Sequence, residues 1–384
     1  MRKTAAFALL LLILVGHACA QPLSPVKESK LKKRGARLIK ESEAVGLSVG
    51  IISRGQSYYF NFGTINPDFN VAPTSQSVYQ IGSVTKTFVS LLLAQAVIEK
   101  KISLDDDIRK YLDDSYPNLE YKGHPIALLH LANYTSGLPD NLLPASATED
   151  SSAFQTEQRM STFTKKDLMQ ALKTVTLDTI PGYHPHHSNT AAQLLRYIIE
   201  KIYASPIEKS VREFILDPLK MNDTSFGTEM SDHNLLTGYN DKGKAMPWFT
   251  NSFHSGTGGI RSSAADFTKY MFYLLRSPDA QTKLALRKTI LVDAGTNKVI
   301  GFNPPDKIDP TKYSVSLNWY HYAPELGNSR IFADGGTPGF ACYVSMYPES
   351  DLGIVLLANK LSEKVFNGLS SFADEIYKIC MDKK

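Results

Sequence analysis

Apolar and polar residues alternate in two short stretches near the start of the chain, as they do in β-strands that bury one face. Apolar side chains recur at every second position over residues 47–51 and again over residues 58–62. The segment between them, Arg54-Gly55-Gln56, has the composition of a tight turn and predicts a hairpin. Three further strands are expected near the C-terminus, over residues 329–333, 340–347 and 352–359.

Between these ends the apolar residues recur every three or four positions, which is the spacing of helices that pack one face on a core. The helices expected there cover residues 83–98, beginning at Ser83, and residues 104–112, 165–173, 191–203, 207–215 and 263–275. A further, basic helix over residues 26–44 is expected before the hairpin. A closing helix has one apolar face made of Val365, Leu369, Phe372, Ala373, Ile376 and Cys380.

Strands at both ends and helices between them predict an α/β fold of the α+β type. One antiparallel sheet, built from both termini and flanked by helices, would carry an inserted helical region. We expect the sheet part to cover about residues 25–80 and 300–384, and the largely helical part about residues 83–290. No repeat or low-complexity segment interrupts residues 21–384, which are expected to form one domain or one domain with an insertion.

The first twenty residues have the pattern of a signal peptide. Arg2 and Lys3 precede an apolar run over residues 5–15, and small residues around Cys19 resemble a cleavage site. A membrane-spanning helix needs about 20 apolar residues, so this run is too short, and no later stretch qualifies. We therefore expect export to the periplasm or secretion. A lipoprotein acylated at Cys19 is the less favoured alternative, because the preceding residues match a lipobox poorly.

The charge of the chain excludes some classes of partner. Removal of residues 1–20 takes away two of the 42 basic residues and leaves 40 against 38 acidic residues. A nearly neutral protein offers no electrostatic basis for binding nucleic acid or an anionic membrane. The content of 43% hydrophobic and 21% charged residues is that of an ordinary globular protein.

Only Cys342 and Cys380 remain after cleavage, too few for a disulfide framework. The expected strand, hairpin and closing helix separate the two residues by roughly 20 Å, from the rise per residue of each element. A disulfide requires Cα atoms within about 7 Å, so we expect two core residues and no bridge.

Two clusters could bind metal but have simpler explanations. Asp105-Asp106-Asp107 lacks the glycine and distal glutamate of a calcium loop and is better placed to supply negative charge at a helix start. A histidine cluster could hold zinc, yet no acidic or thiol partner is well placed in the nearby sequence. Its members are His184, His186 and His187. We expect no metal and no cofactor.

Ser83 and Lys86 are the strongest candidates for chemistry. In a helix that begins at Ser83, residues three apart share a face, so the lysine amine can reach the serine hydroxyl. Unpaired N–H groups at the helix start would stabilise the resulting negative charge, and burial would lower the pKa of the lysine. Matches at Ser24–Lys27 and Ser29–Lys32 lie in a lysine-rich stretch that a solvated helix face explains.

Seven segments, in order, resemble a known family: the class C β-lactamases and penicillin-binding-protein-like serine hydrolases, which include D-alanyl-D-alanine carboxypeptidases, D-aminopeptidases and esterases. The resemblance covers nearly the whole chain after the signal peptide and implies that Ser83 is the nucleophile and Lys86 its base. The segments are residues 46–51, 81–87, 128–139 (LLHLANYTSGLP), 181–182 with 188–189, 217–221, 258–263 and 335–340 (GGTPGF).

The second motif of the family is Tyr-x-Asn, and this chain has His187-Ser188-Asn189 at that place. The family tyrosine relays protons, which a neutral histidine can also do near pH 7. The resemblance thus implies that His187 is a catalytic residue and that Asn189 orients the substrate and Lys86. A second interpretation is that Ser188 or Asn189 only caps the following helix, and that the relay has been lost.

The third motif is Lys-Thr-Gly or His-x-Gly in the family, and it aligns with Ala333-Asp334-Gly335 here. The basic group that holds a substrate carboxylate is therefore missing, and an acid is adjacent. The resemblance assigns the oxyanion hole to the backbone N–H groups of Ser83 and Gly336, and it places Asp334, Thr337 and Asn141 beside the substrate. Asn141 could instead satisfy its own turn.

We therefore expect an exported serine hydrolase that cleaves an ester or amide through an acyl-enzyme on Ser83. Its partner would be a small-molecule or peptide substrate, which cell-wall material could supply. One alternative is a true class C β-lactamase or D-alanyl-D-alanine carboxypeptidase that holds the substrate carboxylate elsewhere, for example with Arg261. Another is a catalytically inactive protein that keeps the cleft and binds a ligand.

Overall fold

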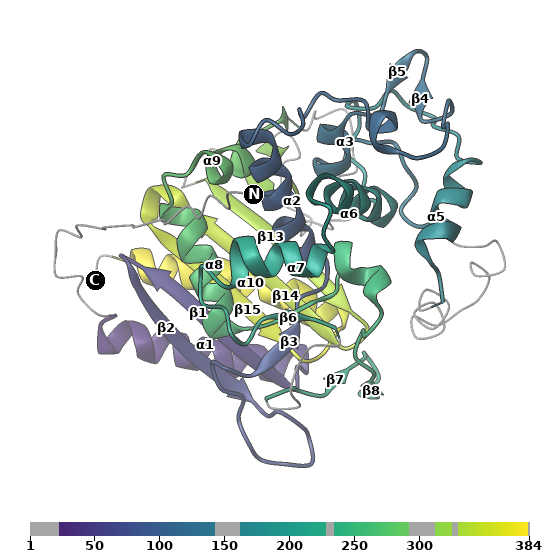
Figure 1. Ribbon diagram of the computed structural model, residues 1–384. Helices are drawn as coiled ribbons and strands as arrows, with labels where there is room; N and C mark the ends of the chain where they lie inside the picture. The colour runs from purple at the N-terminus through teal and green to yellow at the C-terminus, as the bar shows by residue number, and fades with distance from the viewer. Residues whose placement is uncertain (1–22, 143–161, 228–233, 292–311, 325–328, 383–384) are drawn as a thin grey trace, which may run out of the picture.

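The computed structural model describes residues 23–142, 162–227, 234–291, 312–324 and 329–382. The expected signal peptide, with Cys19, lies outside these residues. An antiparallel sheet of eight strands forms the centre, with the strand order β10-β11-β12-β13-β14-β15-β1-β2 (Figure 1). Along that order the strands are Ile290–Leu291, Tyr313–Val315, Tyr320–Tyr322, Arg330–Thr337, Phe340–Tyr347, Leu352–Ala358, Gly46–Ser53 and Gln56–Gly63.

Both ends of the chain contribute to this sheet. β1 pairs with β2 as a hairpin and with β15 on its other side, where Leu47 lies opposite Ala358. Every residue of β1, β14 and β15 is buried, because helices cover both faces of these central strands. The predicted fold class, a mixed fold with an antiparallel sheet built from both termini, is confirmed.

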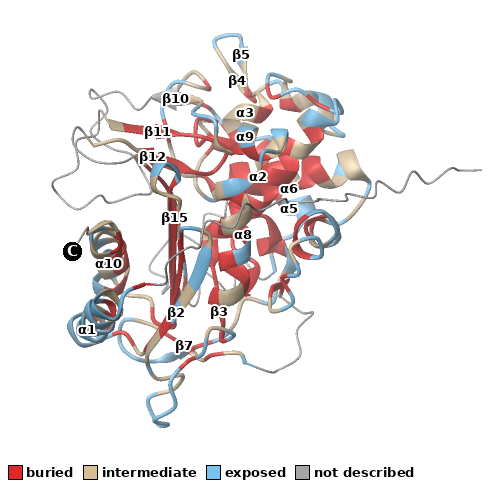
Figure 2. Cartoon of the chain, turned by 90° about the vertical axis from the view of Figure 1, so that its left-hand side faces the viewer, coloured by how far each residue is buried: buried red, intermediate tan, exposed pale blue. Residues whose placement is uncertain are grey.

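Two helices cover one face of the sheet. α1 (Pro25–Ser42) packs against α10 (Glu363–Met381), and α10 contacts β14 and β15 (Figure 2). The six apolar residues predicted for the closing helix are all buried in this layer. Ser362 caps the helix by accepting a hydrogen bond from the Val365 N–H at 3.2 Å.

The other face carries the larger helical part. α8 (Ala264–Arg276) lies across β1 and β15, and α2 (Thr85–Ile98) is buried almost all round, as its apolar sequence predicts. The other α-helices in the described ranges are α3 (Leu128–Ala132), α5 (Lys165–Leu172), α6 (Asn189–Tyr203), α7 (Ile207–Val211, continued by a π-helical turn Arg212–Leu216) and α9 (Ala280–Leu286). Among the described helices, none is long and apolar enough to cross a membrane.

Within the residues that the structure describes, three smaller sheets border the helical part. One has the order β3-β9-β6 and consists of Val78–Gln80, Ile260–Ser263 and Ser225–Phe226. The two others are hairpins, β4 (Glu120–Tyr121) with β5 (His124–Pro125) and β7 (Gly238–Tyr239) with β8 (Ala245–Met246). β3 leads directly into the turn that carries Ser83.

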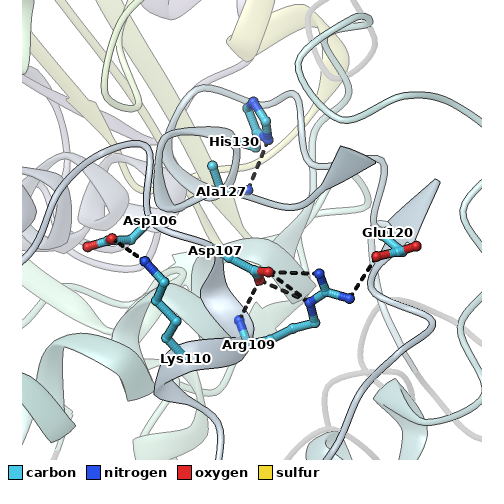
Figure 3. A network of polar contacts seen from close by, with 7 residues as sticks. All are labelled: Asp106, Asp107, Arg109, Lys110, Glu120, Ala127 and His130. Carbon is cyan, nitrogen blue, oxygen red and sulfur yellow. Dashed lines mark hydrogen bonds and ion pairs between the residues drawn. The ribbon is translucent and has the colours of Figure 1, made fainter. Parts of the chain in front are cut away.

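The helix expected over residues 104–112 is wrong, because only a 3₁₀ turn forms there, from Ile108 to Tyr111. Side chains occupy the backbone N–H groups instead: Asp106 accepts from Ser103 at 2.7 Å and Asp107 from Arg109 at 2.9 Å. The Arg109 guanidinium then joins Asp107 to Glu120 (Figure 3). These acids cap a short turn, which fits the structural role expected for them.

The two cysteines lie in different layers of the core. Cys342 belongs to β14 and packs on the α2 side of the sheet, whereas Cys380 belongs to α10. Within the described part of the chain both are buried, free thiols. Burial raises the pKa of each thiol, so neither is a reactive thiolate near neutral pH.

Candidate active site

Ser83 and Lys86 meet at the start of α2. Ser83 lies in a 3₁₀ turn, Gly82–Val84, and the α-helix begins two residues later than expected, at Thr85. The Lys86 ammonium Nζ donates to Ser83 Oγ at 2.8 Å. Ser83 is partly exposed while Lys86 is only 1% exposed, so the serine is the more accessible of the two residues.

Glycines allow strand β13 to pass directly against this turn. Gly82 has a φ of +54°, and a Cβ added there would lie 2.5 Å from the Gly336 nitrogen. A Cβ at Gly335 would lie 2.3 Å from the Ile81 carbonyl oxygen and 2.7 Å from the Ser83 nitrogen. The backbones of Ser83 and Gly336 are therefore neighbours, and Gly336 is exposed.

Burial lowers the pKa of Lys86 to about 8, although the negative charges of Asp140 and Asp334 oppose the shift. A second hydrogen bond, from Nζ to the Thr257 carbonyl oxygen at 3.2 Å, holds the amine in place. An ordinary lysine is almost wholly charged near neutral pH, whereas a pKa of about 8 gives an appreciable neutral fraction. The chain thus places an amine that is partly neutral near pH 7 beside the Ser83 hydroxyl, where it can act as a base.

His187 lies across the site, immediately before α6. Its Nδ1 is 2.8 Å from Asp140 Oδ1, and its ring stacks beside Tyr134 with a centroid distance of 6.3 Å. Burial, and then the charge of Lys86, lower the pKa of His187, while Asp140 acts in the opposite direction. Ser188 caps the helix, as the second interpretation of this motif predicted: its Oγ accepts from the Ala191 N–H at 3.0 Å.

The two asparagines meet at the rim of the same site. Asn189 Nδ2 donates to Asn141 Oδ1 at 3.2 Å, and Asn141 Nδ2 donates to Asp140 Oδ2 at 3.0 Å. The two amides are therefore held together beside Asp140, and Asn141 does not only satisfy its own turn. The sequence did not single out Asp140, which contacts His187 and both asparagines. Its position directly after the Leu138-Pro139 segment was visible, but no spacing rule links it to His187.

Asp334 and Thr337 are the remaining candidates, and both lie on β13. Asp334 Oδ2 and Thr337 Oγ1 are buried atoms that find no hydrogen-bond partner among the residues described. Burial raises the pKa of Asp334 to about 7, against the effect of the Lys86 charge. Ala333, where the family has its basic residue, is buried and carries no charge.

Other residues that the sequence raised are engaged elsewhere. Arg261 donates from Nη2 to the Phe249 carbonyl oxygen at 3.0 Å and stacks on Trp248 at 4.8 Å from the ring centroid. The His184 ring packs edge-on against Tyr183, and the His186 N–H donates to the Tyr134 carbonyl oxygen. Over the described ranges, no cluster of three or more His, Cys, Asp or Glu side chains is arranged to hold a metal ion.

Comparisons with known proteins find related sequences over nearly the whole chain. The sequence model of the family described as Beta-lactamase matches residues 34–376. The D-alanyl-D-alanine-carboxypeptidase/endopeptidase AmpH of Escherichia coli K12 is 28% identical over 366 residues, covering 94% of this chain and 91% of AmpH. A β-lactamase of the same strain is 25% identical and covers 91% of this chain and 93% of its own length.

Solved structures share the fold. A β-lactamase/D-alanine carboxypeptidase from Yersinia pestis, complexed with citrate, superposes with a TM-score of 0.76 at 23% identity, covering 92% of this chain and 99% of that one. An octameric penicillin-binding protein homologue from Pyrococcus abyssi gives 0.73, also at 23% identity, with 92% and 77% covered. The resemblance predicted from the sequence motifs is confirmed. Since the family match spans most of the 384 residues, the chain belongs to the Beta-lactamase family and is a serine hydrolase.

Proposed function

We propose that this protein is an exported hydrolase that cleaves an ester or amide bond through an acyl-enzyme on Ser83. The observation that carries the proposal is the 2.8 Å contact between Lys86 Nζ and Ser83 Oγ, made by a buried lysine whose pKa is lowered to about 8. Export rests on the expected signal peptide over residues 1–20.

In the acylation step, neutral Lys86 takes the proton of Ser83 as Oγ attacks the substrate carbonyl carbon. The carbonyl oxygen becomes an oxyanion, for which the N–H groups of Ser83 and Gly336 are the proposed donors. The tetrahedral intermediate collapses when the bond to the leaving group breaks. The proton passes from Lys86 through His187 to the leaving oxygen or nitrogen.

Deacylation repeats these steps with water as the nucleophile. His187 accepts the proton of the attacking water and passes it to Lys86. The ester bond to Ser83 Oγ then breaks, and the proton returns from Lys86 to the serine. The acid product leaves and the enzyme is restored. Asn189 and Asn141, which bind each other at the rim, are proposed to hold the polar groups of the acyl part.

The substrate that fits best is neutral. A substrate carboxylate would find uncharged Ala333 and the acid Asp334 where the family has a cation, and Arg261 is held by Phe249 and Trp248. Small neutral esters and amides are therefore the first candidates. The names of AmpH and of the related β-lactamase favour a second class, cell-wall peptides or β-lactams.

Substitution at the nucleophile tests the proposal. Ser83→Ala should abolish hydrolysis of a neutral aryl ester while thermal unfolding stays unchanged, because a partly exposed hydroxyl contributes little to the core. Lys86→Ala should cost nearly as much, since members of a catalytic unit act non-additively. A Ser83→Ala protein that keeps more than about a tenth of the wild-type kcat/KM would overturn the mechanism. An inactive wild type would favour the ligand-binding alternative.

A further inference from the structure

Asp140 and His187 form a pair that the Tyr-x-Asn motif does not account for, because a tyrosine has no ring nitrogen for a carboxylate to bind. Asp140 Oδ1 accepts a hydrogen bond from the backbone N–H of Asn189 at 3.1 Å and lies 2.8 Å from His187 Nδ1. Its Oδ2 accepts from Asn141 Nδ2 at 3.0 Å. Asp140 is thus fixed by two groups that can only donate.

These contacts decide where the proton of the imidazole lies. Burial alone would raise the pKa of Asp140, but its contacts with His187 and Asn189 and the charge of Lys86 bring the pKa below its ordinary value. The carboxylate is ionised at neutral pH and can only accept, so His187 Nδ1 must carry a hydrogen. Because the pKa of His187 is lowered, its ring is neutral, and Nε2 is left with a free lone pair.

The surroundings of His187 hold the ring in this state. Lys86 of α2 faces it and disfavours a second positive charge, and His186 acts in the same direction from the adjacent position. The Tyr134 ring stacks on one side and lies against Tyr320 in turn, with a centroid distance of 4.9 Å. Asp140 is the acidic group that opposes these effects.

We propose that Asp140 is a positioning residue that holds His187 as its Nδ1–H tautomer, so that Nε2 can accept and return the proton during Ser83 chemistry. The inference rests on the proposed function of His187 and extends the Ser83–Lys86 pair to a relay of four side chains. The proton arrives at Nε2 and leaves from Nε2, while Nδ1–H stays on the ring and stabilises the transient imidazolium through the carboxylate.

The direct test is the tautomer itself, read from ¹⁵N chemical shifts of the full chain with labelled histidine. The spectrum of His187→Tyr assigns the His187 signals by their loss. The wild type should show hydrogen on Nδ1 and none on Nε2 at neutral pH, and Asp140→Ala should move hydrogen to Nε2. A wild-type spectrum with hydrogen on Nε2 overturns the inference, whether or not the protein turns over any substrate.

Kinetics supply the second readout. Asp140→Ala should lower kcat/KM for a neutral ester by about ten- to a hundredfold, as loss of a group that orients a histidine typically does. It should also shift the fall of kcat/KM at acid pH, the acid limb of the pH profile, to lower pH, because the Asp140 carboxylate raises the pKa of both His187 and Lys86. Asp140→Asn should recover part of the rate but show the same shift of the limb.

Ser188→Ala is the matched control, since Ser188 Oγ ties the same segment to the Pro139 carbonyl oxygen at 2.8 Å without touching the imidazole. The kcat/KM of Ser188→Ala should stay within about threefold of the wild-type value, and its acid limb should lie at the same pH as in the wild type. An Asp140→Ala protein that matches this control in rate and pH profile would contradict the inference. Absence of any Ser83 acylation in the wild type would instead refute the proposed function and leave the tautomer result standing.

Discussion

Two nitrogen bases with different pKa values lie beside Ser83. The pKa of Lys86 is lowered to about 8, and that of His187 lies below its ordinary value of 6.5. Each must be neutral to accept a proton, so protonation of either stops the reaction. The acid limb of kcat/KM should therefore fall tenfold per pH unit below about pH 8, and a hundredfold per unit below the pKa of His187. The values of kcat/KM for a neutral ester between pH 5 and 9 locate both breaks, the two pH values at which the slope changes.

His187→Tyr separates the two breaks. The variant restores the family residue, so it should keep measurable activity and the break near pH 8, and it should lose the lower one. A profile identical to that of the wild type would show that another group controls the lower limb.

The residue at position 333 should govern selectivity for charge. Ala333→Lys supplies the missing cation next to Asp334, so kcat/KM for a carboxylate-bearing β-lactam should rise about tenfold or more, which corresponds to about 1.4 kcal/mol in the transition state. The rate for a neutral ester should change little. Efficient hydrolysis of penicillins by the wild type, with no gain from the substitution, would place the carboxylate elsewhere and favour the β-lactamase alternative.

At the scale of elements, the contact between β13 and the Ser83 turn leaves no room for a side chain at Gly335. Gly335→Ala places a methyl group 2.3 Å from the Ile81 carbonyl oxygen, so the strand must move away from Ser83. A displacement of about 1 Å at a reacting centre can cost about a hundredfold in rate, and we expect a loss of that order in kcat. Gly258→Ala is the control near the same turn, because its nearest atom would be 3.6 Å away. Equal losses in both variants would contradict the account.

The sequence pattern predicted those elements in which one periodicity extends over many residues. The β1–β2 hairpin, α8 and α10 formed close to their expected bounds, because their apolar spacing and caps agree. The helix predicted over residues 104–112 did not form, because Asp106 and Asp107 bind nearby backbone N–H groups and hold a tighter turn. The α-helix α2 starts at Thr85 instead of Ser83 for a similar local reason, because the 3₁₀ turn Gly82–Val84 precedes it.

At the scale of the molecule, one asparagine connects the two termini to the middle of the chain. Asn359 Oδ1 accepts from the Gly46 N–H at 2.6 Å, and its Nδ2 donates to the carbonyl oxygens of Ile65 and Thr237. Such contacts join segments that lie far apart in the sequence. The strands predicted at both ends imply that such contacts exist, but no local sequence pattern identifies the residues that make them.

The same limit applies to the candidate site. Ser83 and Lys86 could be paired from the sequence because one helical turn fixes their separation. Thr257, which accepts from Lys86 Nζ, and Asp140, which pairs with His187, come from segments far away in the sequence. These contacts form only when distant segments of the helical part fold against one another. Motif resemblance located His187 and Asn189, whereas the hydrogen bonds between them and Asp140 required the structure.

The most direct measurement is mass spectrometry, of the intact protein and then of its proteolytic peptides, after brief exposure to a fluorophosphonate and, separately, to an aryl ester. We expect one covalent adduct on the peptide that contains Ser83. The fluorophosphonate adduct should persist, while the acyl adduct should disappear as product forms, and Ser83→Ala should show neither. An adduct of equal yield in Ser83→Ala, or ester turnover with the label on another residue, would contradict the assignment of Ser83 as the nucleophile.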